Sequence, residues 1–256
     1  MTLREQFDLR CGKGDITVSF DKLGYLNAKH RRILVDRDPP DMALLSDLWL
    51  KPINAAVTRF NHIILHQDAK ADSIRPHRFQ KELGANAELV QDLQRGTPAQ
   101  MDEYILQALR ISSKLPEPKS NIEDWVKENE HLFWAVSVPA LEKRAHDLPY
   151  QEIFNGKEPC DLARAIRDFL DAADAVSARK WNTAAALDGV FKPLIKNLTY
   201  RDRNTHEIVR AGGSILLRWA LMGGDHGPAL IPIMGLMGKE ETVMRLQRAL
   251  DVAESM

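Results

Sequence analysis

The stretch Cys160–Ala178, CDLARAIRDFLDAADAVSA, decides the fold class. Its apolar residues recur at helical spacing, at Leu162, Ile166, Phe169 and Ala173, and charged residues occupy positions between them. This spacing places the apolar side chains on one face of an α-helix, whereas a strand would require a period of two residues. The stretch therefore predicts a long amphipathic helix with one buried face.

The same helical period extends from this stretch in both directions along the chain. Segments that share it cover residues 42–50, 54–69, 98–113, 131–146, 181–198, 205–221 and 240–253, and another helix is expected to begin at Ser120 or Asn121 with Trp125 on its apolar face. Thr97 and Pro98 are typical of a helix start, with Thr97 as the cap and Pro98 in the first turn. About eight to ten helices predict a mainly α protein, a multi-helix bundle.

The helical domain is expected to span residues 39–256, after a smaller N-terminal segment. Residues 1–38 contain two short β-branched runs, DITVSF at 15–20 and RILVD at 32–36, which predict two strands. We therefore expect residues 1–38 to be a β-containing segment. The Pro-rich connection at 115–120 is a candidate sub-boundary of the helical domain, although a helical-hairpin connection explains it equally well.

Composition excludes several classes of protein. The chain has 256 residues, of which 44% are hydrophobic and 28% charged, and its net charge is -1. These values exclude a wholly disordered chain and a histone-like polycation. The two cysteines, Cys11 and Cys160, cannot build a disulfide scaffold or a four-cysteine zinc site. Without a signal-peptide pattern or a membrane-spanning stretch, we expect a cytoplasmic protein with no membrane partner, and no motif predicts a cofactor.

One short motif carries a chemical meaning. Arg201 is followed by Asp202 and, four residues further, by His206, between two predicted helices. This pattern resembles the signature of the HEPN superfamily, an Arg, a polar residue and a His at the start of a late helix in a helical bundle. The resemblance implies a metal-independent ribonuclease of a toxin or defence system that often works as a dimer.

The residue types of the motif suit metal-free cleavage of RNA. A His with a pKa near neutrality can accept or donate the proton at a reacting oxygen, so His206 would be the acid or base. The planar guanidinium of Arg201 would stabilise the charge on the phosphate. Asp202 would orient one of the two. A polar inter-helix loop, in which Arg201 and Asp202 pair, remains the alternative interpretation.

A second candidate is a basic stretch that starts on the helix predicted over 54–69. His62 and His66 lie four residues apart on one helix face, a spacing that also suits a metal ion, but neighbouring cations favour an anion instead. A solvated helix face explains the pattern as well. The residues predicted to contact nucleic acid are Arg59, His62, His66, Lys70, Arg75, His77, Arg78 and, beside the motif, Arg203.

These observations give one leading hypothesis and two alternatives. The leading hypothesis is a HEPN-like RNase or RNA-binding effector, with Arg201, Asp202 and His206 as catalytic residues. The first alternative is a non-catalytic helical subunit of a larger protein or nucleoprotein assembly. A metal-dependent helical enzyme that uses His62 and His66 is the second. The sequence leaves open whether the chain is an enzyme, and it predicts RNA or another nucleic acid, and a protein partner or a second copy of the chain, as partners.

Overall fold

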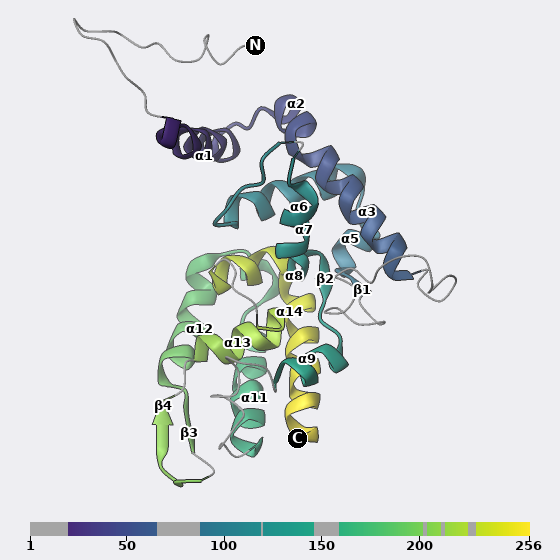
Figure 1. Cartoon of the computed structure of the whole chain (residues 1–256). Coiled ribbons are helices and arrows are strands. Elements are labelled where there is room, and N and C mark those ends of the chain that lie inside the picture. The colour runs from purple at the N-terminus through teal and green to yellow at the C-terminus, as the bar shows by residue number, and fades with distance from the viewer. Residues whose placement is uncertain are drawn as a thin grey trace, which may run out of the picture.

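The computed structural model describes residues 20–65, 88–118, 120–145, 159–201, 204–210, 213–224 and 229–256. In this part of the chain helices dominate, and the strands form two short antiparallel ribbons (Figure 1). The predicted mainly α fold is confirmed. Figure 1 places the helices of residues 20–133 above those of residues 138–255.

The upper group follows the chain from its first described residue to the first ribbon. Its elements are α1 (Phe20–Asp36), α2 (Met42–Leu45), the π-helical turn η2 (Ser46–Leu50), α3 (Lys51–Leu65), β1 (Glu88–Leu89), α5 (Gln91–Arg95), α6 (Pro98–Ile111), α7 (Ile122–Glu128), α8 (Glu130–Phe133) and β2 (Trp134–Ala135). β1 pairs antiparallel with β2, with Leu89 opposite Trp134.

The lower group contains the stretch with the strongest helical period. Its elements are α9 (Val138–Ala145), α11 (Pro159–Ala175), the 3-10 turn η4 (Ala178–Lys180), α12 (Ala184–Asn197), β3 (Thr199–Arg201), β4 (Ile208–Arg210), α13 (Gly213–Met222) and α14 (Leu230–Ser255). The buried faces of α11, α12, α13 and α14 form one continuous hydrophobic core with the upper group.

The helix predicted over 160–178 is α11, and its apolar stripe lies in that core. Ile166, Phe169 and Ala173 are fully buried. The ring of Phe169 stacks on that of Phe191 from α12, with 6.3 Å between ring centroids. Burying a large aromatic side chain contributes about 2–3 kcal/mol, so this stripe is a main source of the stability of the lower group.

The predicted strand at 32–36 is wrong, because these residues form the last part of α1. Val35 is fully buried there, and Arg32 donates hydrogen bonds to the carbonyls of Leu109 (3.1 Å) and Arg110 (3.0 Å) at the end of α6. Tertiary contacts thus override the local β preference of a short β-branched run. The other predicted strand, at 15–20, lies outside the described residues apart from Phe20, which begins α1.

Several helix boundaries also differ from the predictions. The predicted start of α6 is confirmed, with Thr97 as its cap. The segment 131–146 is divided into α8, β2 and α9, with Pro139 near the start of α9 because its missing N–H is tolerated there. α14 starts at Leu230, ten residues before the predicted helix, and is interrupted at Gly238, whose φ of 81° is non-helical.

Among the helices of the described residues, none is both long enough and apolar enough to span a bilayer.

Candidate nucleic-acid interface

The described residues of the predicted ribonuclease motif, Arg201 and His206, lie in a β-hairpin. β3 and β4 pair antiparallel, with Arg201 opposite Ile208. His206 is exposed in the connection between them, with a φ of 56°, a conformation that is uncommon for residues other than glycine. The helix predicted over 205–221 is therefore wrong at its start, because strand β4 comes first and α13 begins at Gly213.

This hairpin lacks the helix start that the HEPN resemblance requires. β-branched and aromatic residues are favoured in strands. This preference explains why Tyr200 and Val209 pair across the hairpin and are not part of a helix. Asp202 and Arg203 lie outside the described residues, and Arg201 is placed only as a strand residue. The fold therefore places Arg201 in a strand and His206 in a turn, and neither lies at the start of a helix.

The predicted basic stretch is only partly within the described residues. Arg59 and His62 lie on exposed positions of α3, and the guanidinium of Arg59 forms an ion pair with the carboxylate of Glu123 on α7. An adjacent carboxylate reduces the attraction of this cation for phosphate. The remaining predicted contacts on this stretch, His66, Lys70, Arg75, His77 and Arg78, lie outside the described residues. Among the described residues, no group of three His, Cys, Asp or Glu side chains could hold a metal ion.

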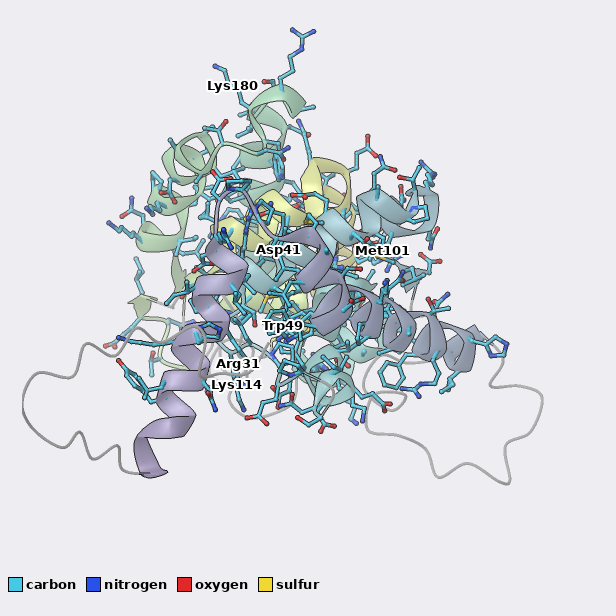
Figure 2. All side chains as sticks on the ribbon, turned by 90° about the horizontal axis from the view of Figure 1, so that it is seen from above. Arg31, Asp41, Trp49, Met101, Lys114 and Lys180 are labelled. Carbon is cyan, nitrogen blue, oxygen red and sulfur yellow. The ribbon has the colours of Figure 1, made fainter. Side chains whose placement is uncertain are left out.

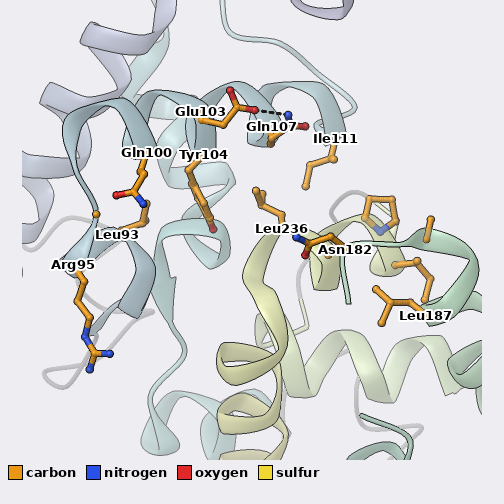
Figure 3. A pocket seen from close by; sticks show the side chains of 15 residues that line it. Leu93, Arg95, Gln100, Glu103, Tyr104, Gln107, Ile111, Asn182, Leu187 and Leu236 are labelled. Atoms are coloured by element: carbon orange, nitrogen blue, oxygen red, sulfur yellow. Dashed lines mark hydrogen bonds between the residues drawn. The ribbon is translucent and has the colours of Figure 1, made fainter. Parts of the chain in front are cut away.

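One hollow of the described surface lies where the two groups of helices meet. It is an open pocket of about 860 Å³ between α5 and α6 on one side and α12 and α14 on the other (Figure 3). Its apolar lining comes from both groups of helices, with Leu93, Ile111, Leu187, Ile231 and Leu236. A pocket with apolar walls can accept the flat face of an aromatic or heterocyclic ring.

Amide and charged side chains surround this apolar surface. Gln107 donates from Nε2 to Oε1 of Glu103 across 2.7 Å, and both residues lie on the α6 side (Figure 3). Gln100 Oε1 accepts from the backbone N–H of Thr97, so its amide nitrogen remains available as a donor. Asn182 contributes a third amide from the opposite wall. Amide side chains that carry both donors and acceptors are suited to reading the edges of unpaired bases.

Cations lie at two places around the pocket. Arg95 belongs to the lining itself, and Arg179 and Lys180 of η4 precede Asn182 by only a few residues. Lys180 projects from the edge of the molecule (Figure 2). In the part of the chain that the structure describes, these three side chains form no ion pair, unlike Arg59 on α3. Cations without carboxylate partners attract phosphate more strongly than paired ones.

None of these pocket residues was predicted from the sequence as a site residue. Gln100 and Gln107 lie two turns apart on one predicted helix, but no spacing in the sequence connects them with Asn182 on the opposite wall. The available signal was indirect, because Asn182 follows the basic pair Arg179 and Lys180 and lies two residues before the first residue of α12.

Comparison with known proteins finds similarity to proteins other than the HEPN superfamily. Residues 146–250 match the family model described as an anticodon binding domain. A glutamate–tRNA ligase of Pelobacter propionicus is 33% identical over 133 residues, which are 47% of this chain and 27% of that protein. A glutamate–tRNA ligase of Bacillus mycoides is 22% identical over 158 residues, 57% of this chain and 29% of that protein. No solved structure matches.

These findings overturn the HEPN assignment and, with it, the predicted ribonuclease and defence function. The matched region 146–250 contains the hairpin with Arg201 and His206 and also the pocket wall formed by α12 and the start of α14. The chain spans less than a third of the length of the curated relatives that it matches, at 27% and 29%. The first alternative, a helical non-catalytic part of a larger protein or nucleoprotein assembly, fits these similarities better. In sequence the chain is thus similar, over residues 146–250, to an anticodon-binding domain, and in part to glutamate–tRNA ligases.

Proposed function

We propose that this chain is a tRNA-binding helical region of a glutamate–tRNA ligase-like protein and that its pocket receives an unpaired nucleotide of the tRNA. The observation that carries the proposal is the match of residues 146–250 to an anticodon binding domain. One wall of the pocket, from Asn182 to Leu236, lies inside this matched region. The other wall, on α5 and α6, lies outside the matched region and would complete the site.

The chemistry of the pocket supports an unpaired base as its occupant. A base that is unstacked from its neighbours presents a flat face, which the apolar lining from Ile231 and Leu236 would cover. Its edge would then meet the amides of Gln107 and Asn182. The phosphates on either side would remain near the pocket rim, where Arg95 lies.

A binding measurement tests this proposal. The probes are a transcript of glutamate tRNA and its isolated anticodon stem-loop, each titrated against the wild-type chain and the Asn182→Ala variant. The loss of a base-reading amide should weaken binding about tenfold. Asn197→Ala is the matched control, because Asn197 is an exposed amide on α12 that does not line this pocket. Failure of the wild-type chain to bind either RNA would overturn the proposal.

The other partner and location predictions stay predictions. A protein partner or a second copy of the chain, and a cytoplasmic location, are compatible with a region of a tRNA ligase. Size-exclusion chromatography with light scattering would test for a second copy directly, since a dimer would have twice the 29.0 kDa mass of the chain.

A further inference from the structure

The two walls of the pocket belong to segments far apart in the sequence, so their spacing depends on contacts behind the pocket. Arg245 on α14 provides the most extensive of these contacts. Its side chain is almost fully buried, at 2% exposure. The guanidinium donates from Nη1 to the carbonyls of His131 and Leu221, both across 2.7 Å, and from Nη2 to the carbonyl of Trp134 across 3.2 Å. Its Nε donates to Oε1 of Glu241 across 2.7 Å.

The three carbonyls that Arg245 binds lie near the ends of helices. His131 belongs to the short helix α8, Trp134 follows it directly, and Leu221 lies in the last turn of α13. Carbonyls at the end of a helix have no partner within the helix and, when buried, need another donor. The planar guanidinium with its five N–H groups can serve several of them at fixed angles, whereas a lysine ammonium acts as a single point.

These contacts lead directly to the first wall of the pocket. Trp134 pairs with Leu89 in the β1–β2 ribbon, and the N–H of Val90 donates to the carbonyl of Phe133 across 2.9 Å. Val90 immediately precedes α5, which carries the pocket residues Leu93 and Arg95. The hydroxyl of Tyr104, another lining residue, donates to the carbonyl of Leu132. Segment 131–134 is therefore tied directly to the start of α5 and to Tyr104 of α6.

The second wall is continuous with Arg245 along α14. The pocket residues Ile231 and Leu236 lie before the interruption at Gly238, and Arg245 lies after it. The interruption is bridged by Thr242, whose hydroxyl donates to the carbonyl of Gly238 across 2.8 Å. Lys239 also donates to the carbonyl of Val176, the residue just after α11, across 3.0 Å. A shift of Arg245 relative to segment 131–134 would thus change the distance between the walls.

We infer that Arg245 is a positioning residue of the pocket, which sets the separation of its α5–α6 wall from its α14 wall. Its effect on RNA binding rests on the proposed function, whereas its effect on the walls does not. A hydrophobic residue of similar volume would fill the same space but would remove the guanidinium donors to the carbonyls of His131, Trp134 and Leu221. Arg245 is a positioning residue because it acts through these backbone segments and does not line the pocket.

Hydrogen exchange tests the positioning role without any RNA. In the full chain, Arg245→Lys should speed exchange of the backbone amides of residues 88–95 at least about tenfold, because opening of this segment becomes less costly. Exchange within α11 should change much less. Trp49→Phe is the matched control. Trp49 is also fully buried and its indole donates to the carbonyl of Pro116 across 3.0 Å, and neither residue belongs to segment 131–134 or lines the pocket.

Titration with the glutamate tRNA transcript gives the second readout. Arg245→Lys should weaken binding about tenfold at an unchanged salt dependence, since no phosphate contact is lost, and Trp49→Phe should leave the affinity within about twofold of wild type. Arg245→Met should give the same pattern if it folds, and Arg245→Lys decides the matter if it does not. Unchanged exchange over residues 88–95 in a folded Arg245→Lys variant would overturn the inference. If the wild-type chain binds no RNA, the exchange result still stands and only the proposed function fails.

Discussion

The indole N–H of Trp181 donates a hydrogen bond to the backbone carbonyl of Met234 across 2.7 Å. Trp181 precedes the pocket residue Asn182, and Met234 precedes the pocket residue Gly235. The bond therefore joins the two segments that form the C-terminal wall of the pocket. Trp181 also contacts the ring of Phe191 edge-on, at an interplanar angle of 84°.

Trp181→Phe should destabilise the chain and weaken RNA binding together. The variant retains an aromatic ring but loses the donor to Met234 and part of the buried volume, which should cost about 2–3 kcal/mol of unfolding free energy. Urea denaturation measures the loss. Trp49→Phe is the control, because the indole of Trp49 donates to the carbonyl of Pro116 across 3.0 Å in the upper group. It should lose similar stability and keep its affinity for the tRNA transcript. Equal losses of affinity for the tRNA transcript in both variants would contradict the proposal that the C-terminal wall of the pocket binds RNA.

Removing the cations of η4 should change the salt dependence of RNA binding. The double variant Arg179→Ala/Lys180→Ala should reduce the slope of log K against log salt by about 1.4, because each lost contact with a single-stranded phosphate removes about 0.7. Titrations at several salt concentrations measure this slope. Lys192→Ala should leave it unchanged, since Lys192 pairs with Asp188 on the same helix. An unchanged slope in the double variant would show that these cations do not meet phosphates.

His131 makes stability depend on pH. Burial lowers the pKa of His131 to about 3 in the folded chain, with further lowering by the nearby Arg245, Arg218 and Arg144. The unfolded chain has a pKa near its ordinary 6.5 and therefore binds a proton in the window between the two values. Folding stability is then highest above pH 6.5 and falls as the pH decreases through that window, by up to about 1.4 kcal/mol per pH unit.

His131→Leu should remove this part of the pH dependence. Both ring nitrogens of His131 are buried without a hydrogen-bond partner among the described residues. Replacing the imidazole with an apolar side chain therefore removes no side-chain hydrogen bond among these residues. Urea denaturation at pH 7 and pH 5 should show a loss of stability about 2 kcal/mol smaller in the variant than in the wild type. An equal loss in both proteins would show that His131 is not the group that titrates.

The close approach of α12 and α13 depends on a glycine. A Cβ atom at Gly213 would lie 2.6 Å from the carbonyl oxygen of Ile195 and 2.8 Å from its Cα, so Gly213→Ala would push the two helices apart. Overpacking of this kind costs about 1–3 kcal/mol. Gly189→Ala on α12 is the matched control, because nothing lies within 4 Å of a Cβ there. It should be stabilising by up to about 1 kcal/mol, since alanine favours helices. Thermal unfolding compares the two, and a stabilised Gly213→Ala would contradict the packing.

The sequence predicted those elements whose local signal agrees with their tertiary environment. The period of Leu162, Ile166 and Phe169 predicts α11 because the same face that repeats along the sequence packs in the core. Thr97 predicts the start of α6 because capping is a contact between near neighbours. The run at 32–36 was misread because Arg32 finds its carbonyl partners in α6, far away along the chain.

The candidate site was harder to predict because its residues follow no local sequence pattern. Arg201, Asp202 and His206 match a short motif. The pairing of β3 with β4 excludes a helix start there, and this pairing depends on residues before and after the motif. Arg245 lies four residues after Glu241, a spacing that usually marks a solvent-exposed pair on a helix. Only the folded chain shows that both are buried and that Arg245 also reaches three carbonyls.

Crosslinking tests the central claim most directly. Glutamate tRNA transcribed with 4-thiouridine is bound to the full chain, irradiated and digested, and the crosslinked peptides are identified by mass spectrometry. The proposed site predicts crosslinks within residues 93–111 and within 182–187 or 231–236, which contain the two walls of the pocket. These crosslinks should decrease when unlabelled tRNA competes. Competed crosslinks confined to α3 or to the β3–β4 hairpin, with none in either wall, would contradict the assignment of the pocket.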